Sequence, residues 1–566
     1  MPNKKTSKWR KILRRTFYIF AFICVAFCIF FAFVEELYEY TPPHIENLAT
    51  KLNEYKQVIQ KNNYTQIGNS WSKKEQELLL LHAHGDPFAI GYTSGKLVGQ
   101  IAPKLEDALL QRVEEIVGST SLIWMFRKVG YVIYSDLQNY FSNDILQEVY
   151  GYSLAVPDKH PELGSSYFRA LNYQAAHDTG HRVLENVLSL QGCTSFAAWG
   201  ESTLNGHLII GRNFDFEIGD VFDRFKIVQV VVPQKGIPFL SVSWPGMSGV
   251  VSGVNKEMLA VTINAGKSDH AKWKATPVTI VVRKILQEAK NIQEAIAILK
   301  NSQTYVSESF LIADGKNNEV AIVEKSPEIT RIRHAKHFSQ ALVCSNHFLN
   351  DDFQTHKNHN IFVKEGSSPK RLERMRELIS KHQGQITPQI TATILRDTKL
   401  KNEKEIGLSH LHSINPSICS HSVILDLTDG IIWVNSGPNQ SGRYLPISIK
   451  SIFEQQPHES FIINEKIIEA DPLVSPKKVA QLISWRQNIK LWVQKKAPLD
   501  KIVTEMRKLN PQHFLTIVAE GDLYFQNGQL LQAKQKWQSA LKSHPYGEWV
   551  TDIQNRIEKI GDKKHE

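Results

Sequence analysis

The dipeptide Gly192-Cys193 has the composition of a self-cleavage junction. A thiol attacks a carbonyl carbon as the thiolate, and with a free pKa near ~8.5 it needs a base. If the chain is cut after Gly192, the released α-amino group of Cys193, with a pKa near ~8, can act as that base. Gly192 has no Cβ, which lets the thiol reach the preceding carbonyl. The pair therefore predicts a cysteine nucleophile freed by an N-to-S acyl shift.

The cysteine count leaves room for such a free thiol. Cys24 and Cys28 lie in an apolar run, and Cys193, Cys344 and Cys419 remain. Three cysteines cannot all pair with one another in disulfides, so at least one of them is expected to be a free thiol. A buried structural cysteine is the alternative for Cys193 taken alone.

The elements around Cys193 change from helical to β. Residues 78–83 read as a strand, and helical periodicity follows to about 187. Residues 193–200 and 207–211, joined by Asn205-Gly206, predict a hairpin that opens the β part. Further strands are expected at 226–233, 239–244, 258–264, 309–324, 329–334, 341–346, 422–427 and 431–435, with helices at 278–299 and 368–382. Runs of strands that alternate with runs of helices predict an α+β layered domain.

Several motifs resemble the cysteine N-terminal-nucleophile (Ntn) hydrolases. These are Gly-Cys-Thr-Ser at 192–195, Gly-Arg-Asn-Phe-Asp-Phe at 211–216 and His-Gly-Asp-Pro-Phe-Ala-Ile-Gly-Tyr at 84–92. The junction and the last motif are most similar to the acyl-coenzyme A:6-aminopenicillanic acid acyltransferase family, which is related to the choloylglycine hydrolases. The resemblance covers roughly residues 78–440. It implies an αββα sandwich and a self-processed acyltransferase or hydrolase of amide, ester or thioester substrates, with no cofactor or metal.

The resemblance also assigns residues to the site: Cys193, Arg212, Asp215, Asn264, Asn346 and Arg371. Asn264 fits the oxyanion-hole asparagine, a donor worth about 3 kcal/mol. Asp215 is expected to orient the new ammonium, and Arg212 to favour the thiolate. Choloylglycine hydrolases begin essentially at their cysteine, whereas 192 residues precede it here. A small-subunit region, 77–192, must therefore be cut from a catalytic region, 193–455.

The N-terminal sequence predicts a membrane anchor. Residues 1–16 carry seven of the ten net positive charges, and the uncharged run 17–34 is long enough to span about 27 Å as a helix. We expect an uncleaved anchor at 17–36, a cytoplasmic tail at 1–16 and an exported body, with a cleaved signal peptide as the alternative. Residues 37–76 read as a stalk. The remaining charge of +3 gives no reason to expect nucleic acid.

The C-terminal residues 456–566 are predicted to be helical. Gly521, Tyr524, Ala533, Trp537, Ala540 and Pro545 match one copy of the tetratricopeptide spacing. This pattern suggests a protein partner at 519–545, and a helical hairpin packed on the enzyme is the alternative.

Two other kinds of catalytic site, a metal site and a serine nucleophile, fit the sequence less well. His410, His412, Cys419 and His421 cluster in sequence, but their spacing fits no common metal signature. Residues 246–249, Gly-Met-Ser-Gly, lack the Gly-x-Ser-x-Gly elbow of serine hydrolases. The non-enzymatic alternative is an unprocessed, membrane-tethered interaction protein. The position beside a bilayer suggests lipid-like acyl substrates, whereas the choice between hydrolysis and acyl transfer stays open.

Overall fold

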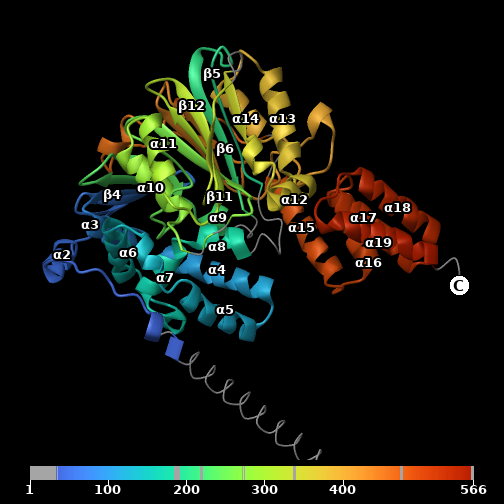
Figure 1. Ribbon diagram of the computed structural model, residues 1–566, viewed down its shortest axis with the longest axis horizontal. Coiled ribbons are helices and arrows are strands. Elements are labelled where there is room, and N and C mark those ends of the chain that lie inside the picture. Colours follow the sequence, from blue (N-terminus) through green and yellow to red (C-terminus); the bar gives the residue numbers. More distant parts are fainter. Residues whose placement is uncertain are drawn as a thin grey trace, which may run out of the picture.

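The computed structural model has two stacked β-sheets with helices on their outer faces and a separate group of helices at the C-terminus (Figure 1). It describes residues 33–34, 36–183, 192–216, 221–270, 272, 274–335, 340–471 and 476–562. The α+β prediction is confirmed.

The smaller sheet contains the predicted hairpin. Its strands pair antiparallel in the order β14 (Ala341–Cys344), β5 (Thr194–Gly200), β6 (Gly206–Asp215), β15 (Cys419–Asp426), β16 (Ile431–Asn435) and β17 (Tyr444–Ser448). Gly206 has a φ of 74°, in the left-handed region that the tight β5–β6 connection requires.

The larger sheet joins strands from both sides of Cys193. Its order is β1 (Ile59–Lys61), β2 (Tyr64–Ile67), β3 (Ser70–Glu75), β4 (Leu78–Gly85), β7 (Ile227–Pro233), β8 (Phe239–Ser243), β9 (Ser252–Asn255), β10 (Leu259–Gly266), β11 (Ser307–Asp314), β12 (Glu319–Lys325) and β13 (Thr330–Arg333). β4 pairs parallel to β7, and the other neighbours pair antiparallel.

Three apolar clusters hold the layers together. Because side chains alternate between the two faces of a strand, Ile210 of β6 packs between the sheets and Ile209 packs outward. The outward side is covered by α13 (Ser368–Lys381) and α14 (Pro388–Leu395), with α12 (Lys357–Glu365) nearby (Figure 1). The far face of the larger sheet packs against α10 (Val278–Glu288) and α11 (Ile292–Asn301).

Helices from the region before Cys193 lie below the sheets in Figure 1. They are α2 (Leu48–Glu54), α3 (Pro87–Val98), α4 (Ala102–Val117), α5 (Thr120–Ile133), α6 (Asn143–Ala155), α7 (Ser166–Tyr173) and α8 (Ala176–Val183), and the short α9 (Val221–Phe225) follows the cysteine. α8 is the last described element before Gly192.

The structure differs from the predicted stalk at 37–76. Tyr40 and Trp71 are buried, and β1, β2 and β3 extend the larger sheet from β4. Trp71 stacks on His82 of β4 with ring centroids 5.1 Å apart. β1, β2 and β3 are short and rich in polar residues, so their alternation of apolar and polar residues is weak. The sequence therefore predicts a linker for a segment that is part of the domain.

The predicted boundary at 455/456 lies too early. Phe461 and Ile462 are buried in the cluster between the sheets, and Ile468 pairs with Tyr444. The helical tail begins at Pro476, with α15 (Pro476–Val493), α16 (Leu499–Leu509), α17 (Phe514–Gln526), α18 (Leu530–Lys542) and α19 (Glu548–Asp562).

The tail contacts the body as well as itself. Arg486 donates to the carbonyl oxygen of Ser417 over 2.6 Å, and Asn510 donates to that of Leu408 over 2.8 Å. Within the tail, α17 and α18 pack closely, since a Cβ on Gly521 would lie 2.3 Å from Trp537 Nε1. The tetratricopeptide assignment stays a prediction.

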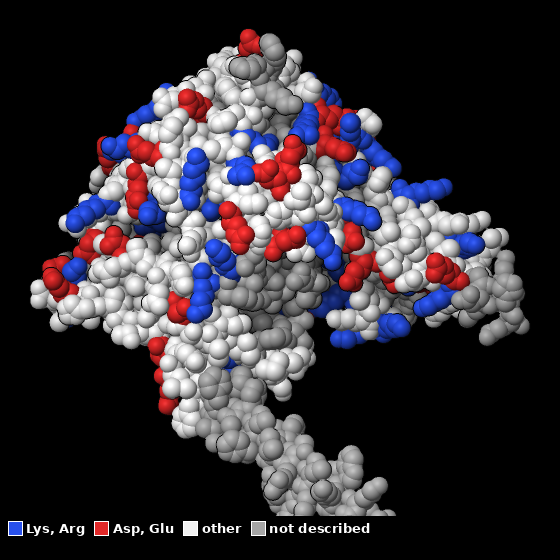
Figure 2. Space-filling view, viewed as in Figure 1, with Lys and Arg blue, Asp and Glu red and all other residues white. Residues whose placement is uncertain are grey.

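The predicted anchor at 17–36 lies outside the described residues except for 33, 34 and 36. Among the residues that are described, none of the helices combines the length and apolarity that a bilayer crossing requires. On the face shown in Figure 2, positive and negative side chains are interspersed.

Candidate active site around Cys193

Cys193 lies directly before β5, in the middle of the smaller sheet. The register pairs Ser195 with Cys344 on one side of β5 and Thr194 with Asn213 on the other. Continuing these registers brings Asn346 opposite Cys193 and Asp215 opposite Gly192. Two of the predicted site residues are thus placed at the junction by strand pairing alone.

Arg371 holds the peptide that the sequence predicts to be cut. Its Nη1 donates to the carbonyl oxygens of Gly192 and Cys193, each over 2.6 Å. Its Nη2 donates to Asn346 Oδ1 over 2.8 Å. The guanidinium is fully buried at the start of α13, and burial lowers the pKa of Arg371 to about 10 despite the opposing charge of Asp215. It is therefore still a cation at neutral pH.

Asp215 is a buried carboxyl group beside Gly192. A Cβ added to Gly192 would lie 3.1 Å from Asp215 Oδ2. Among the described residues, no donor lies at hydrogen-bonding distance and angle from either Asp215 carboxylate oxygen. Burial raises the pKa of Asp215 to about 7, although Arg371, the Cys419 thiol and Arg212 all act to lower it. The Cys419 thiol is close enough to lower the Asp215 pKa but donates to the His421 carbonyl, so the Asp215 oxygens can still accept a hydrogen bond from a further donor.

Asn264 has an amide N–H₂ group available for a substrate. Its Oδ1 accepts a hydrogen bond from Ser195 Oγ over 2.6 Å, from the larger sheet to the smaller one. Its Nδ2 is buried and donates to no group among the described residues. Since Ser195 and Cys193 lie two residues apart on β5, they project from the same face. Asn264 Nδ2 is therefore on the thiol side of the strand.

Arg212 is placed differently from its predicted role. It is fully buried, and its guanidinium donates to Ser252 and to two backbone carbonyls rather than to Asp215. Its Nη1 donates to the Asn213 carbonyl over 2.8 Å and its Nη2 to the Ile263 carbonyl next to Asn264. It also lies over the Phe214 ring, 5.1 Å from the centroid. These contacts make Arg212 a positioning residue for β10, and an effect on the thiolate stays a prediction.

Asn346 links the site to the larger sheet. Its Oδ1 is occupied by Arg371, and its Nδ2 donates to the Ala265 carbonyl over 3.2 Å. Its backbone N–H donates to Ser368 Oγ over 2.7 Å. Asn346 thus orients Arg371 while its own amide is already engaged.

Sequence reasoning missed two neighbours of the site. The motif at 192–195 contains Ser195, but the sequence gives no sign that its hydroxyl donates to the Asn264 amide and fixes its orientation. Cys419 pairs with Asp215 across β6 and β15 and is a free thiol, as are Cys193 and Cys344. Burial, followed by the charge of Asp215, raises the pKa of Cys419 well above its usual value. Only the fold brings Asn264 to Ser195 and Cys419 to Asp215.

The four residues of the sequence cluster near 410–421 do not converge. His410 and His412 pack against Tyr546 of the tail region, and His410 also faces His513. His421 Nε2 lies 3.0 Å from Ser252 Oγ, between the sheets, and Cys419 Sγ donates to the His421 carbonyl. These contacts give separate structural roles to the members of the cluster.

Cys193 thus lies at the start of β5, within two stacked sheets covered by helices, as the resemblance of the motifs implies. Residues 202–440 match the family described as acyl-coenzyme A:6-aminopenicillanic acid acyl-transferase. The resemblance predicted from the motifs is confirmed. The matched region begins after Cys193 and contains the other site residues: Arg212, Asp215, Asn264, Asn346 and Arg371.

Two curated relatives match part of the chain. An uncharacterized protein of Archaeoglobus fulgidus is 22% identical over 269 residues, which is 45% of this chain and 45% of the relative. Protein dcd1B of Dictyostelium discoideum is 22% identical over 270 residues, 45% of this chain and 52% of the relative. The chain spans about half the length of the curated relatives it matches.

Solved structures are similar over a comparable share of the chain. The Caenorhabditis elegans ortholog of N-acylethanolamine-hydrolyzing acid amidase is 17% identical, with a TM-score of 0.32, over 42% of this chain and 93% of its own. A mutant of the conjugated bile acid hydrolase of Clostridium perfringens is 12% identical, with a TM-score of 0.30, over 49% of this chain and 97% of its own.

Proposed function

We propose that the chain cleaves itself between Gly192 and Cys193 and then acts as a cysteine acyltransferase or amidohydrolase. The observation that carries the proposal is the Asp215 carboxyl group, which is buried beside Gly192. Neither of its oxygens accepts a hydrogen bond from the described residues. A buried carboxylate without a donor is costly. An α-ammonium group on Cys193, present only after cleavage, would supply the missing donor.

The self-cleavage step uses the contacts of Arg371. The Cys193 sulfur attacks the Gly192 carbonyl carbon, whose oxygen already accepts a charged hydrogen bond from Arg371. The C–N bond breaks, a thioester forms between Gly192 and Sγ, and the released amine takes up the thiol proton. Water then hydrolyses the thioester, which leaves a Gly192 carboxylate, a free Cys193 thiol and its α-ammonium group.

The mature reaction repeats this chemistry on a second carbonyl. After its α-ammonium group loses a proton to water, the α-amino group of Cys193 removes the thiol proton, and the sulfur attacks an amide, ester or thioester carbon. Asn264 Nδ2 donates to the developing oxyanion while Ser195 keeps the amide oriented. The acyl group stays on Cys193 until water, an amine or an alcohol takes it.

Aromatic side chains in the same apolar cluster as Cys193 suggest an apolar acyl group. Cys193, Phe216 and Trp244 belong to one buried cluster, and Phe222 packs on Trp244 and Phe216 at ring-centroid distances of 4.9 and 5.9 Å. Such surfaces bind hydrocarbon better than polar groups. A fatty-acyl or other lipid-like donor is consistent with this cluster.

The membrane arrangement belongs to the same proposal. Residues 17–36 would anchor the chain, with residues 1–16 in the cytoplasm and the catalytic region on the outer side, close to lipid-like substrates.

A denaturing gel with N-terminal sequencing tests the self-cleavage. We expect two fragments from the full chain, the larger beginning with Cys193, and a single intact chain from Cys193→Ala. Cys344→Ala, which removes another buried free thiol, should still be cleaved. An intact wild-type chain would contradict the proposal and favour the interaction-protein alternative.

A second experiment tests the acyl-enzyme. The processed protein is incubated with fatty-acyl amides, fatty-acyl thioesters and penicillins, and the mass of the Cys193 fragment is measured. A mass increase equal to the acyl group supports the proposal. If the processed protein is acylated by none of these donors, the acyl-substrate assignment fails while the cleavage result stands.

A further inference from the structure

We propose that His177, His181 and Glu308 bind one divalent cation, and that the cation is Zn²⁺. The site lies outside the catalytic group around Cys193, on the helix-facing side of the larger sheet. Its three potential ligand atoms lie within 4.8 Å of one another. The proposal does not depend on the proposed acyl-transfer function.

The fold brings the three side chains together from two elements. His177 and His181 are four residues apart on α8, a spacing that places both on one face of a helix and that zinc sites use. Glu308 lies on β11, opposite Ala265 of β10. It shares the strand face of Phe310 and Ile312, which pack toward the helices, whereas Asn264 and Ser309 point to the opposite face.

The distances suit a small metal ion. His177 Nε2 lies 3.1 Å from His181 Nε2 and 4.0 Å from Glu308 Oε1, and His181 Nδ1 lies 3.7 Å from Glu308 Oε1. Ligand bonds of ~2.0–2.2 Å in a tetrahedron separate neighbouring ligand atoms by about 3.3 Å. Each histidine offers one nitrogen to an ion, and the three ligand atoms of such a set lie within 4.8 Å of one another, so binding requires the side chains to close by up to about 1.5 Å. The side chains are 8%, 5% and 0% exposed.

Asp178 fixes the tautomer of His177. Its Oδ1 lies 3.0 Å from His177 Nδ1, and its Oδ2 accepts a hydrogen bond from the Val278 backbone. A proton on Nδ1 leaves the lone pair of His177 Nε2 directed at His181. Metal-binding histidines commonly donate their other nitrogen to a carboxylate in this way.

The ligand types select the metal. Two imidazoles and one carboxylate match zinc sites that keep a fourth position open, whereas Ca²⁺ and Mg²⁺ prefer oxygen ligands. The two histidines come from the region before Gly192 and the glutamate from the region after it. A bound ion would therefore crosslink the two parts of the chain.

Elemental analysis of the purified full chain tests the site. After treatment with a chelator, incubation with Zn²⁺ and removal of free metal, we expect about one zinc per chain, as for a single site with three protein ligands. His181→Ala and the nearly isosteric Glu308→Gln should each reduce bound zinc more than tenfold. His207→Ala is the matched control, because His207 belongs to a second histidine–carboxylate group with Asp426 and Asp429.

A spectroscopic measurement guards against misfolded variants. Co²⁺ bound at a four-coordinate site with two imidazoles absorbs visible light, and the folded fraction of each variant is measured by circular dichroism. Loss of the absorbance in folded Glu308→Gln, with retention in His207→Ala, supports the site. A wild-type chain without stoichiometric zinc, or zinc that survives both site substitutions, overturns the proposal.

Discussion

Replacing Arg371 by methionine separates the chemistry of the junction from its packing. The substitution keeps a long unbranched side chain in α13 but removes both hydrogen bonds to the Gly192 and Cys193 carbonyls. The Gly192 oxygen is the atom that would become the oxyanion during cleavage. Arg371→Met therefore removes a charged donor from the place where negative charge develops.

The expected loss follows from the value of one oxyanion donor. Deleting such a donor slows reactions by ~10²–10³-fold, about 2.7–4 kcal/mol of transition-state stabilisation. Arg371 donates to the reacting oxygen over 2.6 Å from a fully buried position, so the upper part of this range applies. Arg371→Lys keeps the charge but cannot donate to both carbonyls and Asn346 as a planar fork does, and should fall between methionine and wild type.

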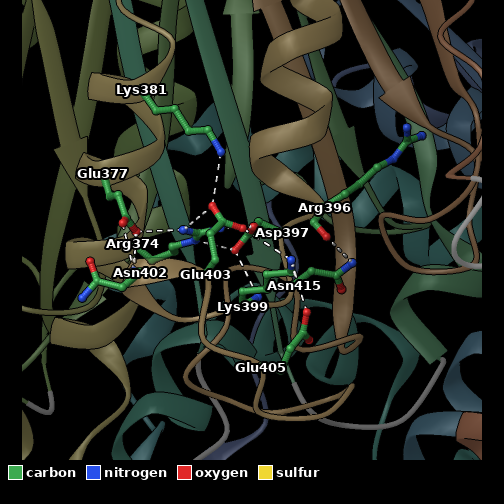
Figure 3. A network of polar contacts seen from close by, with 10 residues as sticks. All are labelled: Arg374, Glu377, Lys381, Arg396, Asp397, Lys399, Asn402, Glu403, Glu405 and Asn415. Carbon is green, nitrogen blue, oxygen red and sulfur yellow. Dashed lines mark hydrogen bonds and ion pairs between the residues drawn. The ribbon is translucent and has the colours of Figure 1, made fainter.

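The assay follows the disappearance of full-length chain on denaturing gels after cell-free synthesis, with circular dichroism to establish that each variant is folded. Arg374→Met is the matched control, since Arg374 is a buried arginine on the same helix. Figure 3 shows that Arg374 instead joins a network with Glu377, Asp397 and Glu403. Its loss should lower stability without slowing cleavage in the folded fraction.

Two results would refute the reasoning. Folded Arg371→Met that is cleaved at the wild-type rate would show that the guanidinium has only a structural role. Equal slowing in Arg371→Met and Arg374→Met would attribute the effect to general loosening of α13.

Three further predictions follow from other contacts. In uncleaved Cys193→Ala, the raised Asp215 pKa makes the folded state bind more protons than the unfolded state between pH 3.8 and about 7. Stability should thus fall by up to about 1.4 kcal/mol per pH unit as pH rises through this window, and urea unfolding should show a weaker dependence once Asp215→Asn is added. Asn264→Ala should leave cleavage nearly unchanged but slow acylation of the mature enzyme by ~10²–10³-fold in a mass-shift assay; equal slowing of both steps would contradict this division. Gly521→Ala should destabilise the tail by about 1–3 kcal/mol through overpacking on Trp537, seen as faster proteolysis of α17 and α18 with unchanged cleavage at the junction.

The local part of the fold was predictable from the sequence. The hairpin after Cys193, its Asn205-Gly206 turn and the α+β order all follow from short-range period and turn residues. The predicted helix at 278–299 is interrupted, because α10 ends at Glu288 and α11 starts after the Asn291 cap. Asn291 caps a helix through its side chain, a signal that the periodicity obscured.

Contacts between distant segments were not predictable. Nothing local marks Trp71 as a partner of His82, or the residues after 455 as part of the core between the sheets. The site shows the same limit. Motif order predicted Arg371 and Asn264 as site residues, but the Ser195 hydrogen bond and the Cys419 pairing arise only when two sheets and neighbouring strands meet.

The parallel pairing of β4 with β7 has a consequence for any nicked form of the molecule. β4 precedes the junction, yet it lies inside the larger sheet, between β3 and β7. Cleavage after residue 192 would leave the backbone hydrogen bonds between β4 and β7 intact, so the two polypeptides would elute together in gel filtration. Their separation would require the sheet itself to melt.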